Sequence, residues 1–539
     1  MLARTLRIHS NDNVAVALSP IAKGQSITPD CLSQALVPAK HKVVTRAIAS
    51  GDPVIMYGTT VGRALMDLAP GMRLTTRNVG HDTAPFSLRD CKLEWTPPDV
   101  SRWTERTFMG FHRTDGQVGT ANHWLVLPLV FCENRNVDLL RRAFEDELGY
   151  SKASPYRQQV AALARNYRTG RVEPQAETEV APVQLFAHVD GIHFLTHQGG
   201  CGGTREDARN LCGLFAGYLH HPNVFGGTVL SLGCENAQVD LLLEELEKRN
   251  AQFDKSLHIY RQQDYPSADA LLRQAIRDTF AGLMQANEAR RAPAPLSALT
   301  LGLECGGSDG FSGISANPAM GHASDMLVAM GGKVILAEFP ELCGVEQALI
   351  DRCVHRSAAE RFTHLMQSYS DLAKAVGSGF EANPSPGNIR DGLLTDAMKS
   401  AGAARKGGTS PVTAVLDYPE YVTESGLNLL CTPGGDVESV TAIAGAGAQV
   451  VLFSTGLGTP TGNPVAQVIK ISSNTALARR FPDLIDIDTG GIINGSATIE
   501  NTGEAILDFV VRVVSGQEFT CATRLGQHDF IPWKRGVSL

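Results

Sequence analysis

Three cysteines stand directly behind apolar runs that have the length of buried strands. LVLPLVF leads into Cys132, GGTVLSLG into Cys234 and LTLGLE into Cys305, and small or polar residues follow each of them. Ligands of open parallel sheets bind beyond the carboxyl ends of the strands, so thiols at such ends could meet at one site. A free cysteine is also often a small buried hydrophobe. Because three cysteines share this position, the pattern favours a common site.

A fourth cysteine lies in a glycine-rich turn close to a histidine. Cys201 follows the run GIHFLTH within THQGGCGGT, and His197 lies four residues before it. Imidazole, thiolate and carboxylate together can hold a divalent first-row metal. We therefore predict that His197 and Cys201 bind a metal. Cys132, Cys234 or Cys305 would complete its ligand set. The alternatives are a histidine that bonds only to backbone and an iron–sulfur cluster that uses the thiolates.

The segment CGGSDGFSGISANP, residues 305–318, is unusually rich in glycine, hydroxyl and amide groups. A polyhydroxylated ligand needs such groups, because each of its hydroxyls must find a partner when it leaves water. We predict that Ser308, Asp309 and Asn317 bind ligand hydroxyls. A surface loop with local side-chain-to-backbone bonds is the alternative. His322, four residues after this segment, is a candidate acid or base, although a core or surface histidine is the commoner case.

Two later loops, NPSPGN at 383–388 and STGLGTPTGNP at 454–464, have a similar composition. Their backbone N–H groups could hold a carboxylate, and we predict that Asn388 and Thr455 contact the ligand. Lys406 and Lys470 lie beside such loops and could neutralise that carboxylate, although a solvated lysine is more usual. The pattern GxxxxGK[ST] is absent, and no GxGxxG opens a helix after a strand, so a nucleotide fold is not indicated.

The elements that must position these residues fall into three blocks. We predict that residues 1–80 form a small β-domain with one short helix and that residues 81–106 form a linker. Residues 107–290 and 299–539 alternate strands with helical patterns such as AQVDLLLEELEKR. A second linker, EARRAPAPLSA, separates them. This alternation predicts two α/β domains with largely parallel sheets.

The whole chain narrows the class of protein. Its formal net charge of −8 argues against a nucleic-acid partner. The start lacks a secretory h-region, and the longest apolar run, WLVLPLVFC, is too short to span a bilayer. We therefore expect a cytoplasmic protein without a membrane partner. An odd number of cysteines, 11, argues against a disulfide framework and leaves thiols free for metal.

Several long motifs resemble the altronate/galactarate dehydratase family over nearly the whole chain. The first block resembles its small SAF-type β-domain, and GFHRTDGQVGTANHWLVLPLVFC resembles the opening of its catalytic part. The most distinctive matches are HPNVFGGTVLSLGCENAQ and CGGSDGFSGISANPAMGHASD. NPSPGN, KGGTSP, GLNLLCTPGGD and FSTGLGTPTGNP are further matches, and FIPWKRG is closer to the altronate branch.

The resemblance implies dehydration of a sugar acid, D-altronate first, to a 2-keto-3-deoxy acid with Fe²⁺, sometimes replaced by Mn²⁺. Cys132, Cys201, Cys234 and Cys305 match cysteine positions of the family. Three departures stand out. LTTRN replaces a histidine-rich VHxHN turn. Ala121 and Leu457 each replace an arginine.

Such a reaction removes a weakly acidic proton next to a carboxylate and expels a poor leaving group, so it needs a base and benefits from a metal and an acid. The catalytic candidates are Cys305, His197, His322 and Lys406. Galactarate or a sulfonated hydroxy acid is an alternative substrate. A sugar-acid-binding regulator without catalysis is the alternative of another class. A small-molecule sugar acid is the expected partner, and the chain could form a homo-oligomer.

Overall fold

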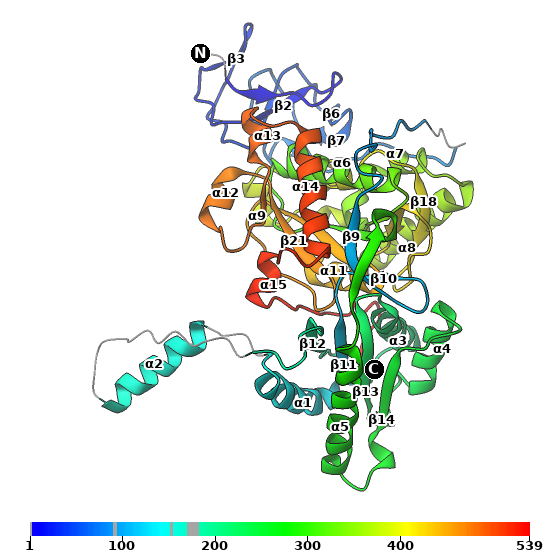
Figure 1. Ribbon diagram of the computed structural model, residues 1–539. Coiled ribbons are helices and arrows are strands. Elements are labelled where there is room, and N and C mark those ends of the chain that lie inside the picture. The colour runs from blue at the N-terminus through cyan, green and yellow to red at the C-terminus, as the bar shows by residue number, and fades with distance from the viewer. Residues whose placement is uncertain (1–2, 90–93, 151–154, 170–182) are drawn as a thin grey trace.

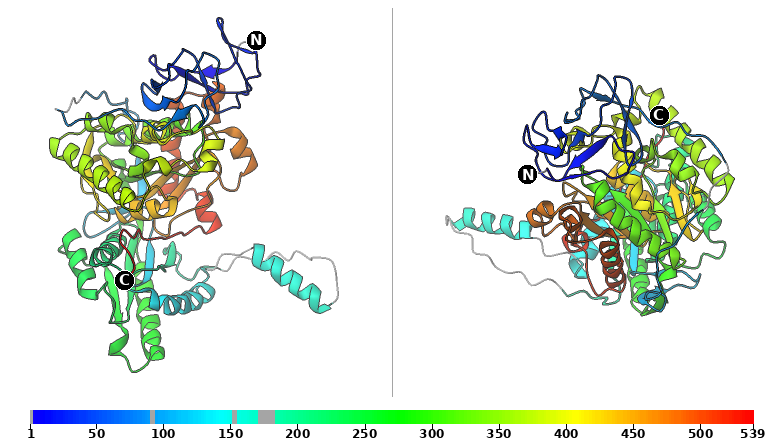
Figure 2. Two further views of the ribbon diagram at one scale, coloured as in Figure 1. Left: turned by 180° about the vertical axis from the view of Figure 1, so that it is seen from behind. Right: turned by 90° about the horizontal axis from the view of Figure 1, so that it is seen from above.

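The computed structural model describes residues 3–89, 94–150, 155–169 and 183–539. Figure 1 shows the N-terminal β-domain above a C-terminal α/β domain, with a central α/β domain beneath it. Helix α2, Pro155–Thr169, stands away from the body in both Figure 1 and Figure 2. No helix within the described ranges is long and apolar enough to cross a membrane.

The N-terminal domain is built from short antiparallel strands and turns. The short helix predicted here does not form within residues 3–80, because the stretch around Val61 pairs as a strand. Tyr57 and Gly58 have φ angles of 59° and 79°, the conformation of a two-residue hairpin turn. That turn joins β6 to β7. The strands are β1 Thr5–Leu6, β2 Val14–Ala17, β3 Ser26–Thr28, β4 Cys31–Leu32, β5 Lys42–Val44, β6 Pro53–Met56, β7 Thr59–Ala64 and β8 Val79–Gly80.

The central domain holds a four-stranded parallel sheet in the order β12-β11-β13-β14. Helices α3 and α4 share one hydrophobic core with this sheet, and α1 and α5 share another on its other face. The predicted amphipathic helix is α4. The elements are β11 His123–Pro128, α1 Asn134–Glu147, β12 Gly191–Phe194, α3 Arg205–His220, β13 Val224–Ser231, α4 Val239–Arg249, β14 Ser256–Arg261 and α5 Ala268–Ala286.

The second predicted linker is in part a strand. β15, Arg291–Pro295, pairs antiparallel with β9, Thr107–His112, which also pairs with β10, Val118–Gly119. Pro293 and Pro295 indicated a linker, but β15 is an edge strand, where a proline's missing N–H leaves no sheet partner unsatisfied. The two prolines therefore do not exclude a strand here, and the linker prediction is wrong for residues 291–295.

The C-terminal domain holds a parallel seven-stranded sheet in the order β18-β19-β17-β16-β20-β21-β22. Its strands are β16 Thr300–Cys305, β17 Lys333–Leu336, β18 Val412–Leu416, β19 Gly426–Leu430, β20 Val450–Thr455, β21 Gln467–Ser472 and β22 Ile487–Asp488. The main helices are α6 Ala316–Ala329, α7 Glu346–Ile350, α8 Arg356–Ala375, α9 Pro386–Arg390, α10 Asp396–Ala403, α11 Asp436–Gly445, α12 Thr475–Arg480, α13 Gly490–Asn494, α14 Ile499–Val514 and α15 Cys521–Leu525.

The three domains share their hydrophobic cores. α3 of the central domain packs on α11 of the C-terminal domain, where Gly217 approaches Gly445 so closely that a Cβ would lie 2.1 Å from a carbonyl oxygen. Val14 and Val44 of the N-terminal domain pack with Phe311 of the C-terminal domain. The chain is thus an α/β protein with a small N-terminal β-domain and two α/β domains with parallel sheets, as the sequence predicts.

Candidate functional site

The strand order of the C-terminal sheet reverses at the ends of β16 and β20. The chain leaves β16 towards β17 on one side, whereas β20 lies on the other side, and ligands of open α/β sheets bind at such a reversal. The two strand ends run together here. Gly306 N–H donates to the Ser454 carbonyl at 3.0 Å, and Gly456 N–H donates to the Gly307 carbonyl at 3.0 Å.

A thiol, two carboxylates and two ammonium groups meet beyond these strand ends. The Cys305 sulfur lies 2.8 Å from the Lys406 ammonium nitrogen and 3.1 Å from a Glu341 oxygen. Lys406 also pairs with Glu338, and Lys399 pairs with Glu341 at 2.6 Å. All five are buried or nearly so, with Lys399 the most exposed at 10%. We call these five residues the buried charged centre.

Glu338 is held in this centre by an unusual backbone conformation. It follows β17 with a φ of 64°, in the left-handed region that a glutamate seldom adopts. Its N–H donates to the hydroxyl of Thr432 at 2.8 Å, just beyond the end of β19. Such strain persists where surrounding structure enforces it, often at functional sites. Its carboxylate consequently accepts from the Cys305 N–H at 3.2 Å.

Burial and neighbouring charges give the members of the centre different proton affinities. Burial, reinforced by Glu341, raises the pKa of Glu338 to about 7. Burial also raises the pKa of the Cys305 thiol well above its usual range, which keeps the thiol protonated. Burial opposes the charge on Lys406, but the surrounding acidic groups outweigh it and raise the pKa of Lys406. Nearby, burial raises the pKa of Asp436 to about 6. The centre therefore combines an ammonium group, a protonated thiol and a carboxyl that titrates near neutrality.

This donor set has the spacing of metal ligands but already has cationic partners. One donor atom each from Cys305, Glu338 and Glu341 lie within 4.8 Å of one another. Lys406 contacts the thiol and Glu338, and Lys399 contacts Glu341. A divalent ion here would be repelled by two ammonium groups within a few ångströms. The arrangement thus fits anion binding and proton transfer, and it does not fit a metal.

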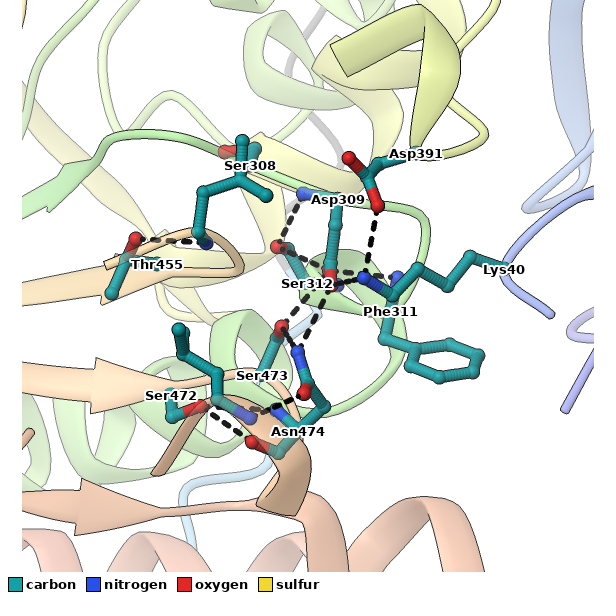
Figure 3. A network of polar contacts seen from close by, with 12 residues as sticks. Lys40, Ser308, Asp309, Phe311, Ser312, Asp391, Thr455, Ser472, Ser473 and Asn474 are labelled. Carbon is teal, nitrogen blue, oxygen red and sulfur yellow. Dashed lines mark hydrogen bonds and ion pairs between the residues drawn. The ribbon is translucent and has the colours of Figure 1, made fainter. Parts of the chain in front are cut away.

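Asp309 lies in a saturated polar network (Figure 3). One carboxylate oxygen accepts from the N–H groups of Phe311 and Ser312 and from the hydroxyls of Ser312 and Ser473. The other accepts from Asn474 and pairs with the Lys40 ammonium at 2.9 Å. The prediction that Asp309 binds ligand hydroxyls is corrected, because its lone pairs are committed to holding loops together.

Ser308, next to Asp309, is placed differently. Its carbonyl accepts from the Asn388 side chain at 2.7 Å, but its buried hydroxyl has no partner among the described residues. A buried hydroxyl without a partner costs free energy that a bound polar ligand would recover. Ser308 is therefore the one residue of this loop whose predicted ligand role the geometry favours.

The other predicted ligand contacts support loops. Asn317 donates to the Gly402 carbonyl at 3.0 Å and accepts from Ser454 at 2.6 Å. Asn388 closes a capping box with Ser385 at the start of α9. The Thr455 hydroxyl accepts from the Gly458 N–H at 2.9 Å, and the Lys470 ammonium donates to the Thr461 carbonyl. These groups are already bonded within the protein, so their predicted contact with a ligand is replaced by a positioning role.

Neither predicted catalytic histidine is available at the centre. His197 Nε2 bonds to the Pro128 carbonyl at 2.9 Å, and Nδ1 accepts from the Gly199 N–H at 2.9 Å. With both ring nitrogens occupied, burial lowers its pKa to about 4, so a metal-ligand or acid–base role is corrected. His322 packs against Gly503 of α14, on the flank of α6, because α6 turns that face towards its neighbouring helix.

The other three predicted thiols lie at the carboxyl edge of the central sheet. Cys132 follows β11, Cys201 lies in the loop after β12 and Cys234 follows β13, and all three are exposed. Their loops touch, because Phe131 N–H donates to the Gly199 carbonyl at 3.1 Å and Asn236 N–H to the Gly200 carbonyl at 2.8 Å. We call these three residues the thiol edge. Cys305 belongs to the other sheet, so the predicted single site divides into two.

A cavity of about 810 Å³ adjoins the thiol edge. Cys201 and Asn236 line it from the central domain, Glu438 of α11 from the C-terminal domain, and Trp533 and Lys534 from the closing segment. α11 begins at Asp436, whose carboxylate lies against Gly306 at the end of β16. The first turn of α11 thus contacts both the end of β16 and the cavity at the thiol edge.

Two positions noted as arginine losses have different surroundings. The backbone carbonyl of Ala121 accepts from Arg113 at 3.2 Å, and Arg291 donates to the adjacent Thr120 carbonyl at 2.9 Å. Two guanidinium groups therefore remain close to Ala121. Leu457 is 44% exposed and lies beside Gly307, where no described arginine takes its place.

Sequence reasoning missed Glu338, Glu341 and Lys399. The same strand-end rule that selected Cys305 applies to GKVILAEFPE, in which both glutamates follow the strand. Lys399 gave no such signal, because it lies within α10 among apolar and small residues.

The chain matches known families along most of its length. The family models described as "Altronate/galactarate dehydratase SAF domain", "D-galactarate dehydratase/Altronate hydrolase, second domain" and "D-galactarate/Altronate dehydratase, C-terminal" match residues 3–82, 110–287 and 296–538. The chain is 32% identical to altronate dehydratase of Bacillus subtilis (strain 168) over 95% of each chain. It is also 32% identical to altronate dehydratase of Escherichia coli (strain K12) over 99% of each. Its identity to the L-threo-forming galactarate dehydratase of E. coli is 30%, over 97% of this chain and 95% of the relative.

Proposed function

Because this chain belongs to the altronate/galactarate dehydratase family of hydro-lyases, we propose that it converts D-altronate to 2-dehydro-3-deoxy-D-gluconate and water. The buried charged centre beyond the ends of β16 and β17 carries the proposal. It combines the cation, the base and the acid that removal of water from an aldonate requires.

Three groups of the centre have a role in this reaction. Lys406 holds the substrate carboxylate and stabilises the negative charge that develops on it as the C–H bond at carbon 2 breaks. Glu338, with a pKa near 7, accepts that proton. The protonated Cys305 thiol donates a proton to the hydroxyl that leaves carbon 3. Water departs, and the enol product then becomes the keto acid.

We also propose that the protein requires iron, which supplies Lewis-acid chemistry when bound. The buried charged centre does not fit a metal, whereas the thiol edge offers three exposed sulfur donors. Thiolates suit iron better than manganese, which prefers oxygen ligands. We therefore expect iron to be preferred, with Mn²⁺ as a weaker substitute. A sugar acid is the expected partner, nucleic acid and membrane are not, and a homo-oligomer stays a prediction.

A substrate panel with keto-acid detection tests the activity. The full chain, prepared anaerobically with iron, is offered D-altronate, galactarate and a sulfonated hydroxy acid. We expect the highest kcat/KM with D-altronate, because two relatives of nearly full length carry that name. Preference for galactarate would overturn the choice of substrate. Saturable binding of D-altronate without turnover would overturn the dehydratase and favour a sugar-acid-binding protein.

A further inference from the structure

The three exposed free cysteines of the described chain are Cys132, Cys201 and Cys234. The seven other described free cysteines are buried or partly buried, which is the usual place for this residue. All three exposed thiols lie at one edge of one sheet, on the loops that follow β12, β11 and β13, which are neighbours in that order. Such a concentration of exposed thiols has no packing role to explain it.

Backbone contacts hold the three loops together. The loop with Cys201 lies between the other two loops and bonds to both. Its Gly199 carbonyl accepts from the N–H of Phe131, the residue before Cys132. Gly200 accepts from Asn236, two residues after Cys234. Consecutive Cα atoms are about 3.8 Å apart, so each cysteine lies within one or two residues of these contacts. Gly200 itself packs against the residues just after β11, where a Cβ would lie 2.1 Å from the Leu129 carbonyl oxygen.

The spacing of the sulfurs discriminates between kinds of metal site. Among the described residues, the three sulfurs do not all lie within 4.8 Å of one another. A single ion bound by all three would require them to be closer, with metal–sulfur distances of about 2.3 Å. A polynuclear cluster holds its cysteines farther apart, because each thiolate binds a different iron atom. The histidine that could have joined a mononuclear site, His197, has both ring nitrogens occupied.

We propose that the thiol edge binds a [4Fe–4S] cluster through Cys132, Cys201 and Cys234. This inference deepens the proposed function. Such clusters usually have four cysteine ligands, so three thiolates leave one iron without a protein thiolate. The cavity of about 810 Å³ begins at Cys201, and its wall includes Lys534 and the glycine-rich turn before α3. None of the five residues of the buried charged centre lines this cavity, so the cluster site and the centre are separate.

The test measures iron and acid-labile sulfide in the full chain after anaerobic reconstitution with ferrous iron and sulfide. We expect equal amounts of iron and sulfide, a broad absorption in the visible range, and an electron paramagnetic resonance signal in one oxidation state. Cys132→Ser, Cys201→Ser and Cys234→Ser should each lose at least half of the iron and sulfide. Cys212→Ala removes a buried thiol from α3 behind the same loop and should retain both.

Cys305→Ala separates the two sites of the molecule, because it should retain iron and sulfide while losing turnover. Iron without sulfide would overturn the cluster. So would wild-type protein that binds neither, or protein in which two of the three edge thiols form a disulfide. Turnover of D-altronate without sulfide would overturn the cluster and leave the proposed function standing. Full cluster content without turnover of any acid in the panel would overturn the proposed function and leave the cluster standing.

Discussion

At the scale of single residues, Glu338 links the fold most directly to the proposed chemistry. Its left-handed backbone places the carboxylate against both the Cys305 N–H and the Lys406 ammonium. Burial opposes its ionisation, so its pKa rises to about 7 even beside a lysine. A base that titrates near neutrality can both accept and release a proton at physiological pH.

Replacing this carboxyl tests its role as the base. Glu338→Gln should lower kcat by on the order of 10²- to 10⁴-fold, the usual contribution of a general base. In the wild type, kcat/KM should fall as pH drops below about 7, because the protonated carboxyl cannot accept a proton. The variant should lose that inflection. Glu346→Gln is the matched control, since burial also raises the pKa of Glu346 to about 7 outside the centre. An unchanged inflection in Glu338→Gln would exclude this base.

The Cys305 thiol is expected to be essential to turnover and dispensable for folding. Cys305→Ala should abolish measurable dehydration, because the acid is lost, whereas the Lys406–Glu338 pair can persist. Circular dichroism and thermal unfolding check that the variant is folded. Cys353→Ala, a buried thiol bonded to the Leu349 carbonyl, serves as the control for loss of a core sulfur. Full activity in Cys305→Ala would remove the thiol from the mechanism.

At the scale of elements, strand ends decide where chemistry can occur. β16 and β17 each deliver a functional group in the residues at or just after the strand, and α10 and the turn after it supply the lysines. In the central sheet, the loop after β12 is fixed between its neighbours by the carbonyls of Gly199 and Gly200. The position of Cys201 therefore depends on a turn that glycine alone fits well.

A single methyl group should displace this turn. Gly200 has a φ of 92°, and a Cβ would lie 2.1 Å from the Leu129 carbonyl. Gly200→Ala should lower the free energy of unfolding by more than 2 kcal/mol, since strain and overpacking add. Gly24→Ala has a similar φ of 78° but open space around it, and should cost only about 1 kcal/mol. Denaturation of both variants measures the difference, and equal losses would contradict the overpacking argument.

At the scale of the whole molecule, the N-terminal domain is bound to two loops of the C-terminal domain, around Asp309 and Asp391. Lys40 lies between Asp309 and Asp391 at 2.9 and 3.1 Å, and the buried Lys42 donates to the Gly392 carbonyl at 2.6 Å. His41 bonds to the Arg390 carbonyl between them. This domain thus contributes to the order of the loop that contains Ser308, even though no residue of it belongs to the buried charged centre.

Loss of the Lys40 ammonium should loosen that docking. Lys40→Met should weaken the contact by roughly 1.5–3 kcal/mol, the range for hydrogen bonds to charged groups. Amide hydrogen exchange should therefore accelerate at residues 40–44 and 309–312. Lys23→Met removes an exposed lysine of the same domain and should leave exchange there unchanged. Unaltered protection in Lys40→Met would show that apolar packing alone holds the domain.

The sequence by itself determined the α/β class, the β-rich start and the positions of the thiols at strand ends, because these depend on local periodicity and on where apolar runs stop. It also placed Lys406 beside a ligand loop. Only the tertiary structure decided which strand ends meet. Cys305, Glu338, Lys399 and Lys406 come together through the order of strands in the sheet, which local pattern does not specify. For the same reason Cys132, Cys201 and Cys234 gather in one sheet while Cys305 belongs to another, and Lys40 reaches Asp309 across 269 residues.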